Sequence, residues 1–381
     1  MLVKDSIKDS VNIFLLFSAA LLSVVPWFEN IFRIKGNIFS ILCLLAINFI
    51  LFNKLNLKKS LFFCLPFFIL ALLSVFYWEE LYLLKIQIYF YLAIFTATSL
   101  DVQLLKKFTE FSSNILCIIL FLSVLSFFYR HYGNPPLFEI LNPDGRSNFF
   151  YLTSFGNESQ NRVSGIFDEP GTLSFISSII VFLRDKFSLS FKKSISILFL
   201  GIFTVSIAHF IFFSMYLLHL LLKEKSLRSP KNYVFFLILF SICLFLNQNR
   251  FTEVLGQDRI SAFLGAFALL DSRSFLFGMD SVCQLGKFDC VGNLKFNDIV
   301  VPFYGDNPLS LLVHYGIFIS FPYYFFMLYF FHYAIKRSSL ILFAIFLLLL
   351  QRPYIMSFGY SVLLSFIIFA FVRERKSLNY D

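Results

Sequence analysis

Long uncharged apolar runs recur along the whole chain and restrict what it can fold into. Residues 11–27 and 38–52 are the first two, and similar runs continue to residue 372. A membrane-spanning helix needs about 20 such residues. Only 14% of the side chains are charged, whereas an average soluble protein has about 25%. So little charge is typical of a chain whose solvent is lipid. The first run also lacks the small-residue cleavage site of a signal peptide.

One apolar run, residues 194–222, is too long for a single upright span. As one helix it would measure about 43 Å at 1.5 Å per residue. Lys and Arg residues lie on both sides of it, and basic flanks are typical of the cytoplasmic face. The run is therefore expected to enter the membrane and return as a short helical hairpin that turns near residues 206–209. The flanking residues are Arg184, Lys186, Lys192, Lys193, Lys223, Lys225, Arg228 and Lys231.

Together these patterns predict an all-α polytopic membrane protein with about twelve transmembrane segments. Residues 1–381 are expected to form a single integral-membrane domain with both chain ends in the cytoplasm. Two large loops, residues 130–170 and 247–307, then face the other side of the membrane. The second loop has a helical apolar pattern at residues 259–270, which predicts a helix lying on the membrane surface. The net charge of +9 follows from this topology, so no nucleic-acid partner is expected.

The first loop ends in a short polar motif, NRVSGIFDEPG, at residues 161–171. Arg162 is a candidate ligand for a diphosphate, because a guanidinium group holds phosphate oxygens with two parallel bonds. Its alternative role is to pair with lipid phosphate or with the nearby carboxylates and to order the loop. Glu169 precedes Pro170, an arrangement typical of a helix start. Glu169 is a candidate general base, and helix capping alone is the alternative.

Further candidates follow in the second loop and beyond it. Asp306 precedes an Asn-Pro pair at another predicted helix start and is a second candidate base. His314 lies about 10 Å along that helix and is either a catalytic residue or a buried histidine bonded to a neighbouring helix. Arg250 and Arg259 are candidate diphosphate ligands, with surface ion pairs as the alternative. Arg352 is another, with contact to lipid headgroups as the alternative.

Cysteine usage and the absence of cofactor motifs narrow the chemistry. Cys283 and Cys290 share one polar loop and would form a disulfide if that loop faces an oxidising compartment. No second cysteine pair and no nearby histidine supports a zinc site there. No ATP-binding loop, dinucleotide-binding glycine pattern or zinc motif occurs in the sequence. No cofactor and no metal are therefore expected, and the energy for a bond-forming reaction would come from an activated substrate.

The motif RVSGIFDEPG at residues 162–171 resembles the bacterial O-antigen polymerase family, within the wider group that includes O-antigen ligases. Two further stretches are similar to that family: an apolar helix and a Phe-Gly pair after Arg259, and the Asp-Asn pair at residues 306–307 with a later Gly316. The predicted plan of many spans and two large periplasmic loops is similar as well.

The resemblance implies a glycosyltransferase in the bacterial inner membrane. Its substrate would be oligosaccharide repeat units linked to undecaprenyl diphosphate, joined at the periplasmic face, with a chain-length regulator as a further partner. The arginines would stabilise the departing diphosphate, and a carboxylate or histidine would accept the proton of the acceptor hydroxyl. One alternative is an O-antigen ligase that transfers glycan to lipid A core, although Asp306 stands where ligases have a histidine. A non-enzymatic lipid-linked sugar flippase is the other.

Overall fold

The fold is taken from a computed structural model of the chain. It describes residues 2–22, 24–25, 36–51, 81–141, 147–155, 162–167, 169–223, 293–296, 299–302, 310–337, 339–351, 360 and 362–367, with isolated helical residues between 65 and 76 and between 234 and 276. The chain divides into two compact units. The first contains residues 1–63, 89–213 and 357–381, and the second contains residues 64–88 and 214–356.

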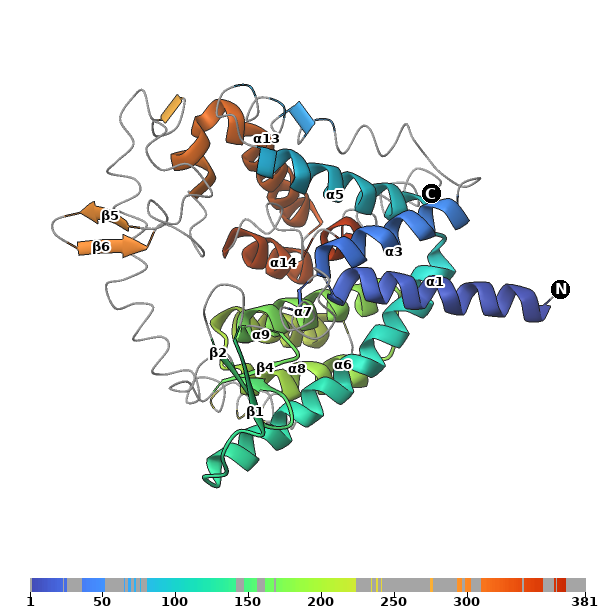
Figure 1. The fold of residues 1–381 in the computed structure, drawn as a ribbon, viewed down its shortest axis with the longest axis vertical. Helices are drawn as coiled ribbons and strands as arrows, with labels where there is room; N and C mark the ends of the chain where they lie inside the picture. The colour runs from blue at the N-terminus through green and yellow to red at the C-terminus, as the bar shows by residue number, and fades with distance from the viewer. Residues whose placement is uncertain are drawn as a thin grey trace. The chain divides into compact units, whose positions relative to one another are not determined.

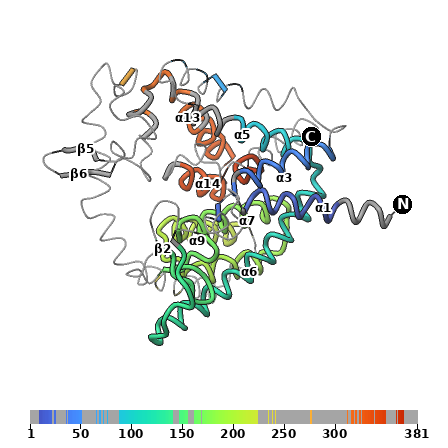
Figure 2. Tube along the Cα trace, in the orientation of Figure 1, coloured from blue at the N-terminus to red at the C-terminus, as the bar shows by residue number. Residues whose placement is uncertain are grey.

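The first unit is built on helices that follow one another along the chain. They are α1 (Leu2–Leu22), α3 (Gly36–Ile50), α6 (Val102–His131), α7 (Pro170–Lys186), α8 (Phe191–Leu200) and the 3-10 helix η2 (Gly201–Thr204). Helices α5 (Leu81–Ser99) and α9 (Ile207–Lys223) are divided between the two units. Figure 2 traces the path of the chain through these elements, in which α1 and α3 pack side by side.

Helix α6 is the longest described helix, with 30 residues. Asp101 begins it, because its carboxylate accepts a hydrogen bond of 2.7 Å from the Leu104 amide and satisfies one of the unpaired donors of the first turn. The helix ends at His131, and Gly133 then adopts a left-handed conformation with φ of 80°. Between Glu110 and Arg130 no side chain is charged.

A four-stranded antiparallel sheet follows α6 and lies beside its C-terminal end (Figure 1). The strands are β1 (Phe138–Leu141), β2 (Ser147–Phe150), β3 (Ser154–Phe155) and β4 (Val163–Gly165), in that order across the sheet. Tyr151, Phe155 and Val163 form a small buried core. The guanidinium group of Arg130 lies 4.9 Å from the centre of the Phe155 ring, a cation–π contact that joins the sheet to the end of α6.

The prediction of an all-α protein with about twelve transmembrane segments and two large periplasmic loops is wrong. Within the described residues, only α6 is long and apolar enough to cross a membrane by length and composition. Several apolar runs become short helices: α8 has 10 residues and α14 (Leu340–Gln351) has 12. The loop predicted at residues 130–170 contains the sheet. Hydropathy measures how apolar a run is, but it does not show whether the run forms one straight helix.

The apolar run 194–222 is interrupted between α8 and α9. Gly201–Thr204 form η2, and Val205 then takes a left-handed conformation with φ of 47°, which is rare for a β-branched residue. The buried His209 at the start of α9 is 2.8 Å from the Leu198 carbonyl oxygen through its Nε2 atom. A Cβ atom on Gly201 would lie only 2.6 Å from that Nε2 atom. The break therefore depends on a glycine that leaves room for the histidine ring.

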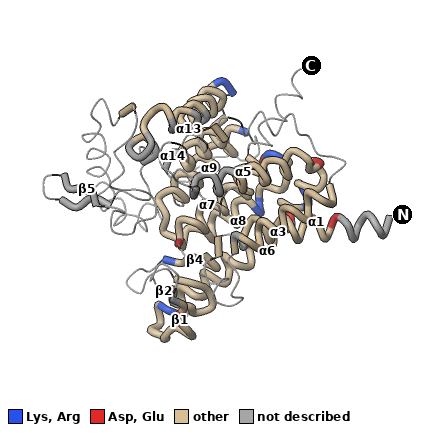
Figure 3. The backbone as a smooth tube through the Cα atoms, turned by 45° about the horizontal axis from the view of Figure 1, so that its top comes forward, with Lys and Arg blue, Asp and Glu red and all other residues tan. Residues whose placement is uncertain are grey.

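Arg184, in the last turn of α7, was predicted to be a cytoplasmic flanking residue, but it is buried. Its Nε donates to Ser194 Oγ at 3.1 Å, its Nη1 to Ser113 Oγ at 3.0 Å and its Nη2 to the Ser190 carbonyl at 2.9 Å. Charged residues are few along the described helices (Figure 3). This guanidinium group thus joins α6, α7 and the start of α8 through hydroxyl and carbonyl oxygens.

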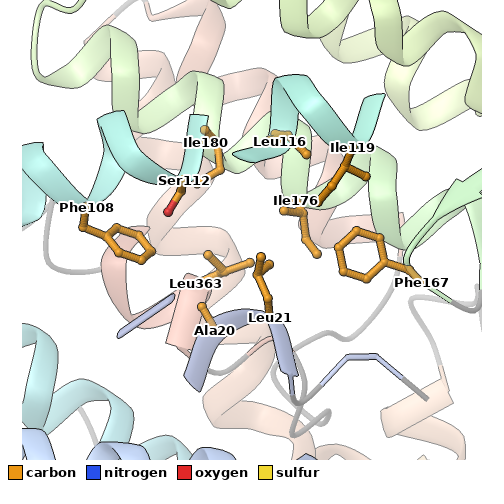
Figure 4. Close-up of a pocket in the computed structure, with 10 residues that line it drawn as sticks. All are labelled: Ala20, Leu21, Phe108, Ser112, Leu116, Ile119, Phe167, Ile176, Ile180 and Leu363. Atoms are coloured by element: carbon orange, nitrogen blue, oxygen red, sulfur yellow. The ribbon is translucent and has the colours of Figure 1, made fainter. Parts of the chain in front are cut away.

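A small, largely apolar cavity lies in the first unit, lined by side chains of α1, α6 and α7 together with Phe167 and Leu363. Ser112 is its polar lining residue, and Figure 4 shows the hydroxyl directed toward the cavity. The Ser112 hydroxyl is buried and has no hydrogen-bond partner among the described residues. A buried hydroxyl without a partner costs free energy of folding.

Two adjacent serines of α6 are expected to respond in opposite ways to substitution. Ser113→Ala removes the acceptor of the Arg184 Nη1 bond and should lower the free energy of unfolding by about 2 kcal/mol, the value of a hydrogen bond to a charged group. Ser112→Ala removes a hydroxyl without a partner and should be neutral or raise that free energy by about 1 kcal/mol. Thermal unfolding of the two purified variants in one detergent measures both. Equal destabilisation would contradict the described bonding.

Among its described residues, the second unit contains a two-stranded sheet and two further helices. The strands are β5 (Asn293–Phe296) and β6 (Ile299–Pro302), and the helices are α13 (Ser310–Lys336) and α14. Helix α13 is kinked at Gly316, where φ is 68° and ψ is 175°. Such a conformation is accessible to glycine and rare for other residues.

Candidate functional site

Arg162 is held by two segments that are far apart in the sequence. It immediately precedes β4, and its Nε donates a hydrogen bond of 3.2 Å to the Thr204 carbonyl at the end of η2. Thr204 is itself fixed, because its hydroxyl donates to the Gly201 carbonyl at 2.8 Å. The Arg162 side chain is half-buried. The guanidinium group is therefore positioned by the backbone of η2 rather than extended into solvent.

The connection from β4 to α7 places Glu169 directly after the sheet. The Phe167 amide donates to the Ser164 carbonyl at 3.0 Å and closes a tight turn. Glu169 is the residue before the helix, with extended backbone angles and no side-chain capping bond, and α7 begins at Pro170. β4, η2 and α7 pack against one another, and Gly165 of β4 lies close to Leu173 in the first turn of α7, so these three elements form one cluster.

Gly165 makes this close packing feasible. Its φ of +68° is unfavourable for residues with a side chain. A Cβ atom there would lie 2.9 Å from Ile119 Cγ2 on α6 and 3.2 Å from Leu173 Cδ2 on α7. The first of the two glycines in the motif at residues 161–171 is thus explained by the approach of β4 to both helices.

Two hydroxyl groups meet in the first turn of α7. The Thr172 hydroxyl lies 2.8 Å from the Tyr360 hydroxyl, and either can be the donor. The Tyr360 ring also packs edge-to-face on Phe175, with 5.1 Å between ring centres. Both hydroxyl-bearing residues are buried. A segment near the C-terminus of the chain thereby contacts the helix start that follows Glu169.

Most of the other predicted site residues lie outside the described residues. These are Asp306, Arg250, Arg259, Arg352, Cys283 and Cys290, and the surface helix predicted at residues 259–270 lies outside them too. The backbone of His314 is described and forms part of α13, two residues before the kink at Gly316. His314 belongs to the second unit and Arg162 to the first.

The described cluster has the parts needed to bind an anion. Helix N-termini carry a partial positive charge and amide donors that favour phosphate groups. Arg162 adds a full positive charge on a neighbouring segment, and Glu169 supplies a carboxylate at the helix start. A half-buried setting strengthens such interactions because little water screens them. A helix start, an arginine and a carboxylate are the kinds of group that phosphate-binding sites use.

Sequence reasoning missed Thr204, Thr172 and Tyr360 as parts of this cluster. Thr204 is 42 residues from Arg162, and Tyr360 is 188 residues from Thr172. The first contact arises when the residue before β4 meets η2, and the second when the segment at Tyr360 meets α7. Only the polar character of Thr204 inside an apolar run offered a signal in the sequence.

In the part of the chain that the structure describes, no group of three or more His, Cys, Asp or Glu residues could hold a metal ion. Comparison of the chain with protein-family models, with curated proteins and with solved structures gives no match.

Proposed function

We propose that this protein is a glycosyltransferase of the bacterial inner membrane that joins oligosaccharide repeat units carried on undecaprenyl diphosphate. The observation that carries the proposal is Arg162, which is bonded to the Thr204 carbonyl of η2, while β4 and η2 both pack against α7. An arginine and a helix start suit the diphosphate that leaves when the glycosidic bond forms. The resemblance of residues 162–171 to O-antigen polymerases gives the substrate class.

In the proposed reaction, the acceptor hydroxyl attacks the sugar carbon that is bonded to the lipid diphosphate. The new carbon–oxygen bond forms as the bond to the diphosphate breaks, and the diphosphate leaves with the electron pair. Arg162 stabilises the growing negative charge, an effect that is strong in a partly water-excluded site. Glu169 accepts the proton of the acceptor hydroxyl. No nucleotide is required, because the donor is already activated.

A membrane location is supported by the surfaces of the described helices. Helix α6 has the length and composition of a span. Helix α3 exposes Ile38, Leu42, Leu45 and Phe49, which recur at helical spacing along one face. Large exposed apolar patches are rare on monomeric soluble proteins and mark contact with lipid or another protein. These surfaces support a membrane location; the inner membrane and the periplasmic side of the reaction are part of the proposal through the resemblance to O-antigen polymerases.

Deleting the gene in its native host and separating the surface glycan on a gel tests this function. Loss of a polymerase leaves a single repeat unit attached to the lipid A core, and a plasmid copy restores the ladder of longer chains. Complete loss of glycan from the core would instead indicate the ligase function. An unchanged ladder in the deletion strain would reject both functions.

A further inference from the structure

The turn between β2 and β3, residues 151–153, has a leucine at its tip. The Leu152 side chain is 48% exposed, whereas Tyr151 and Thr153 on either side are buried. Tight turns at the surface of soluble proteins are usually formed by Gly, Pro, Asn, Asp or Ser. A large apolar residue at an exposed tip therefore requires an explanation.

The amide groups of this turn are satisfied without water. The Ser126 hydroxyl of α6 accepts hydrogen bonds from the Leu152 amide at 3.0 Å and from the Thr153 amide at 2.6 Å. The Tyr151 amide donates to the Thr153 carbonyl at 3.1 Å. In lipid, backbone N–H and C=O groups must be paired within the protein, and non-helical backbone is tolerated there only where protein buries it or it lines a water-filled cavity. The three turn amides are paired, and the residues on either side of Leu152 are buried.

The length of the uncharged part of α6 allows the depth of the turn in a bilayer to be estimated. Residues 111–129 of α6 carry no charge and measure about 28 Å at 1.5 Å per residue, close to the thickness of about 30 Å of a hydrocarbon core. With α6 as an upright span, Glu110 and Arg130 would mark the two edges of the core. Ser126 lies about one helical turn before Arg130, so the turn bonded to Ser126 would lie inside that edge.

An exposed apolar face of α6 continues to the same level. Ile118, Phe121, Leu125 and Phe128 are all between 40% and 56% exposed and recur every three or four residues. This spacing places them on one side of the helix. Leu152 adds an exposed apolar side chain at the depth of the last of these turns.

We propose that the turn at residues 151–153 is embedded in the bilayer, with the Leu152 side chain in contact with lipid acyl chains. This inference rests on the membrane location in the proposed function. In this arrangement the sheet does not lie wholly in the aqueous phase. One of its turns fixes the end of α6 at the membrane edge. Ser126 makes this feasible by accepting both amide hydrogens that lipid could not bind.

Tryptophan fluorescence in vesicles tests the proposal. The two native tryptophans, Trp27 and Trp78, are first replaced by phenylalanine in the full chain. Leu152→Trp is then compared with Phe121→Trp on the exposed face of α6 and with Glu139→Trp on β1. Phosphatidylcholine vesicles carry bromine on the acyl chain either near the headgroup or near the chain end, and iodide in the buffer reports contact with water.

We expect Leu152→Trp to emit at shorter wavelength than Glu139→Trp, to resist iodide and to be quenched most by bromine near the headgroup. Phe121→Trp should be quenched more by bromine near the chain end, because it lies about 7 Å deeper along α6 than Ser126. Quenching of Phe121→Trp by lipid but of Leu152→Trp only by iodide would overturn the embedded turn and leave the membrane location intact. Lack of lipid quenching in both would overturn the membrane location and this inference with it.

A second variant separates lipid contact from a general folding defect. Leu152→Asp keeps the turn amides bonded to Ser126 but places a charge where lipid is expected, so it should reduce the amount of protein in the membrane fraction several-fold. Leu152→Asn, which is polar but uncharged, should reduce it less. Equal amounts of wild type and Leu152→Asp in the membrane fraction would contradict the proposal.

Discussion

Replacing Arg162 with alanine is expected to remove long glycan chains from the cell surface while a single repeat unit remains attached to the core. The guanidinium group is held by the Thr204 carbonyl of η2, and in the proposed reaction it would stabilise the departing diphosphate. Loss of one donor that stabilises transition-state charge lowers a rate by about 100- to 1000-fold. Chain growth at such a rate would not produce a ladder. Gel display of the glycan, with an immunoblot of the membrane fraction, gives the result.

Two companion variants define what the Arg162→Ala result means. Arg162→Lys keeps the charge but not the planar pair of donors, so it should restore little chain growth if a diphosphate is bound bidentately. A transporter that needs only a positive charge would be rescued. Arg337→Ala removes an exposed arginine that lies over the Tyr333 ring in the second unit, and a full ladder is expected from it. Normal chain lengths in Arg162→Ala at normal protein level would refute the role of Arg162.

Gly201→Ala is expected to lower the free energy of unfolding by about 3 kcal/mol. The new Cβ atom would lie 2.6 Å from Nε2 of His209 and would displace a ring that is bonded to the Leu198 carbonyl. Overpacking of a core costs about 1–3 kcal/mol, and the lost hydrogen bond adds about 1 kcal/mol. Thermal unfolding of the purified protein measures the change. Chain growth should fall too, because Gly201 and Thr204 hold the backbone that positions Arg162.

A double-mutant cycle shows whether the His209 ring is the cause. In a His209→Ala background the ring is absent, so adding Gly201→Ala should cost less than about 1 kcal/mol. The two substitutions would then be strongly non-additive, as expected for residues in contact. Additive losses would mean that Gly201 matters for some other reason, and the described packing of η2 against α9 would be wrong.

Local patterns in the sequence were informative where chemistry acts over a few residues. The Glu-Pro pair before α7 indicated a helix start, and α7 begins at Pro170. The basic flanks of residues 194–222 predicted a helical hairpin with a turn near residues 206–209, and the run is interrupted by η2 and the left-handed Val205; the hairpin itself stays a prediction. Caps, prolines and charges of this kind determine local structure through contacts that are short in sequence.

The sheet could not be predicted because its strands are too short to show a period. Strand β3 has only two residues, and the register shifts between Ser154 and Phe155. Polar residues also face inward: Asn148, Thr153 and Ser154 are buried. The segment is also rich in Asn, Pro, Gly and Ser, a composition that predicts a loop rather than strands. The sheet is determined by its packing on α6, and this packing cannot be predicted from residues 138–165 alone.

Long-range contacts explain the remaining differences. Arg184 reads as one member of a cytoplasmic basic flank, yet it is 2% exposed and bonded to serines of two other helices. Thr204 and Tyr360 become part of the candidate site only through segments distant in the chain. A pattern of charges predicts a side of the membrane, but it does not reveal which oxygen atoms will surround a given guanidinium group.

The burial of Arg184 has a consequence for the order of assembly. Moving a guanidinium group out of water before its hydrogen-bond partners are in place costs several kcal/mol of free energy. Its oxygen partners come from Ser113 upstream and from Ser190 and Ser194 downstream. During synthesis, the C-terminal end of α7 must therefore stay hydrated until residue 194 has emerged from the ribosome. Helix α7 can therefore pack into the protein only when α6 and the start of α8 are both present. A nascent chain truncated before α8 would leave α7 unpacked, and quality-control proteases would recognise it.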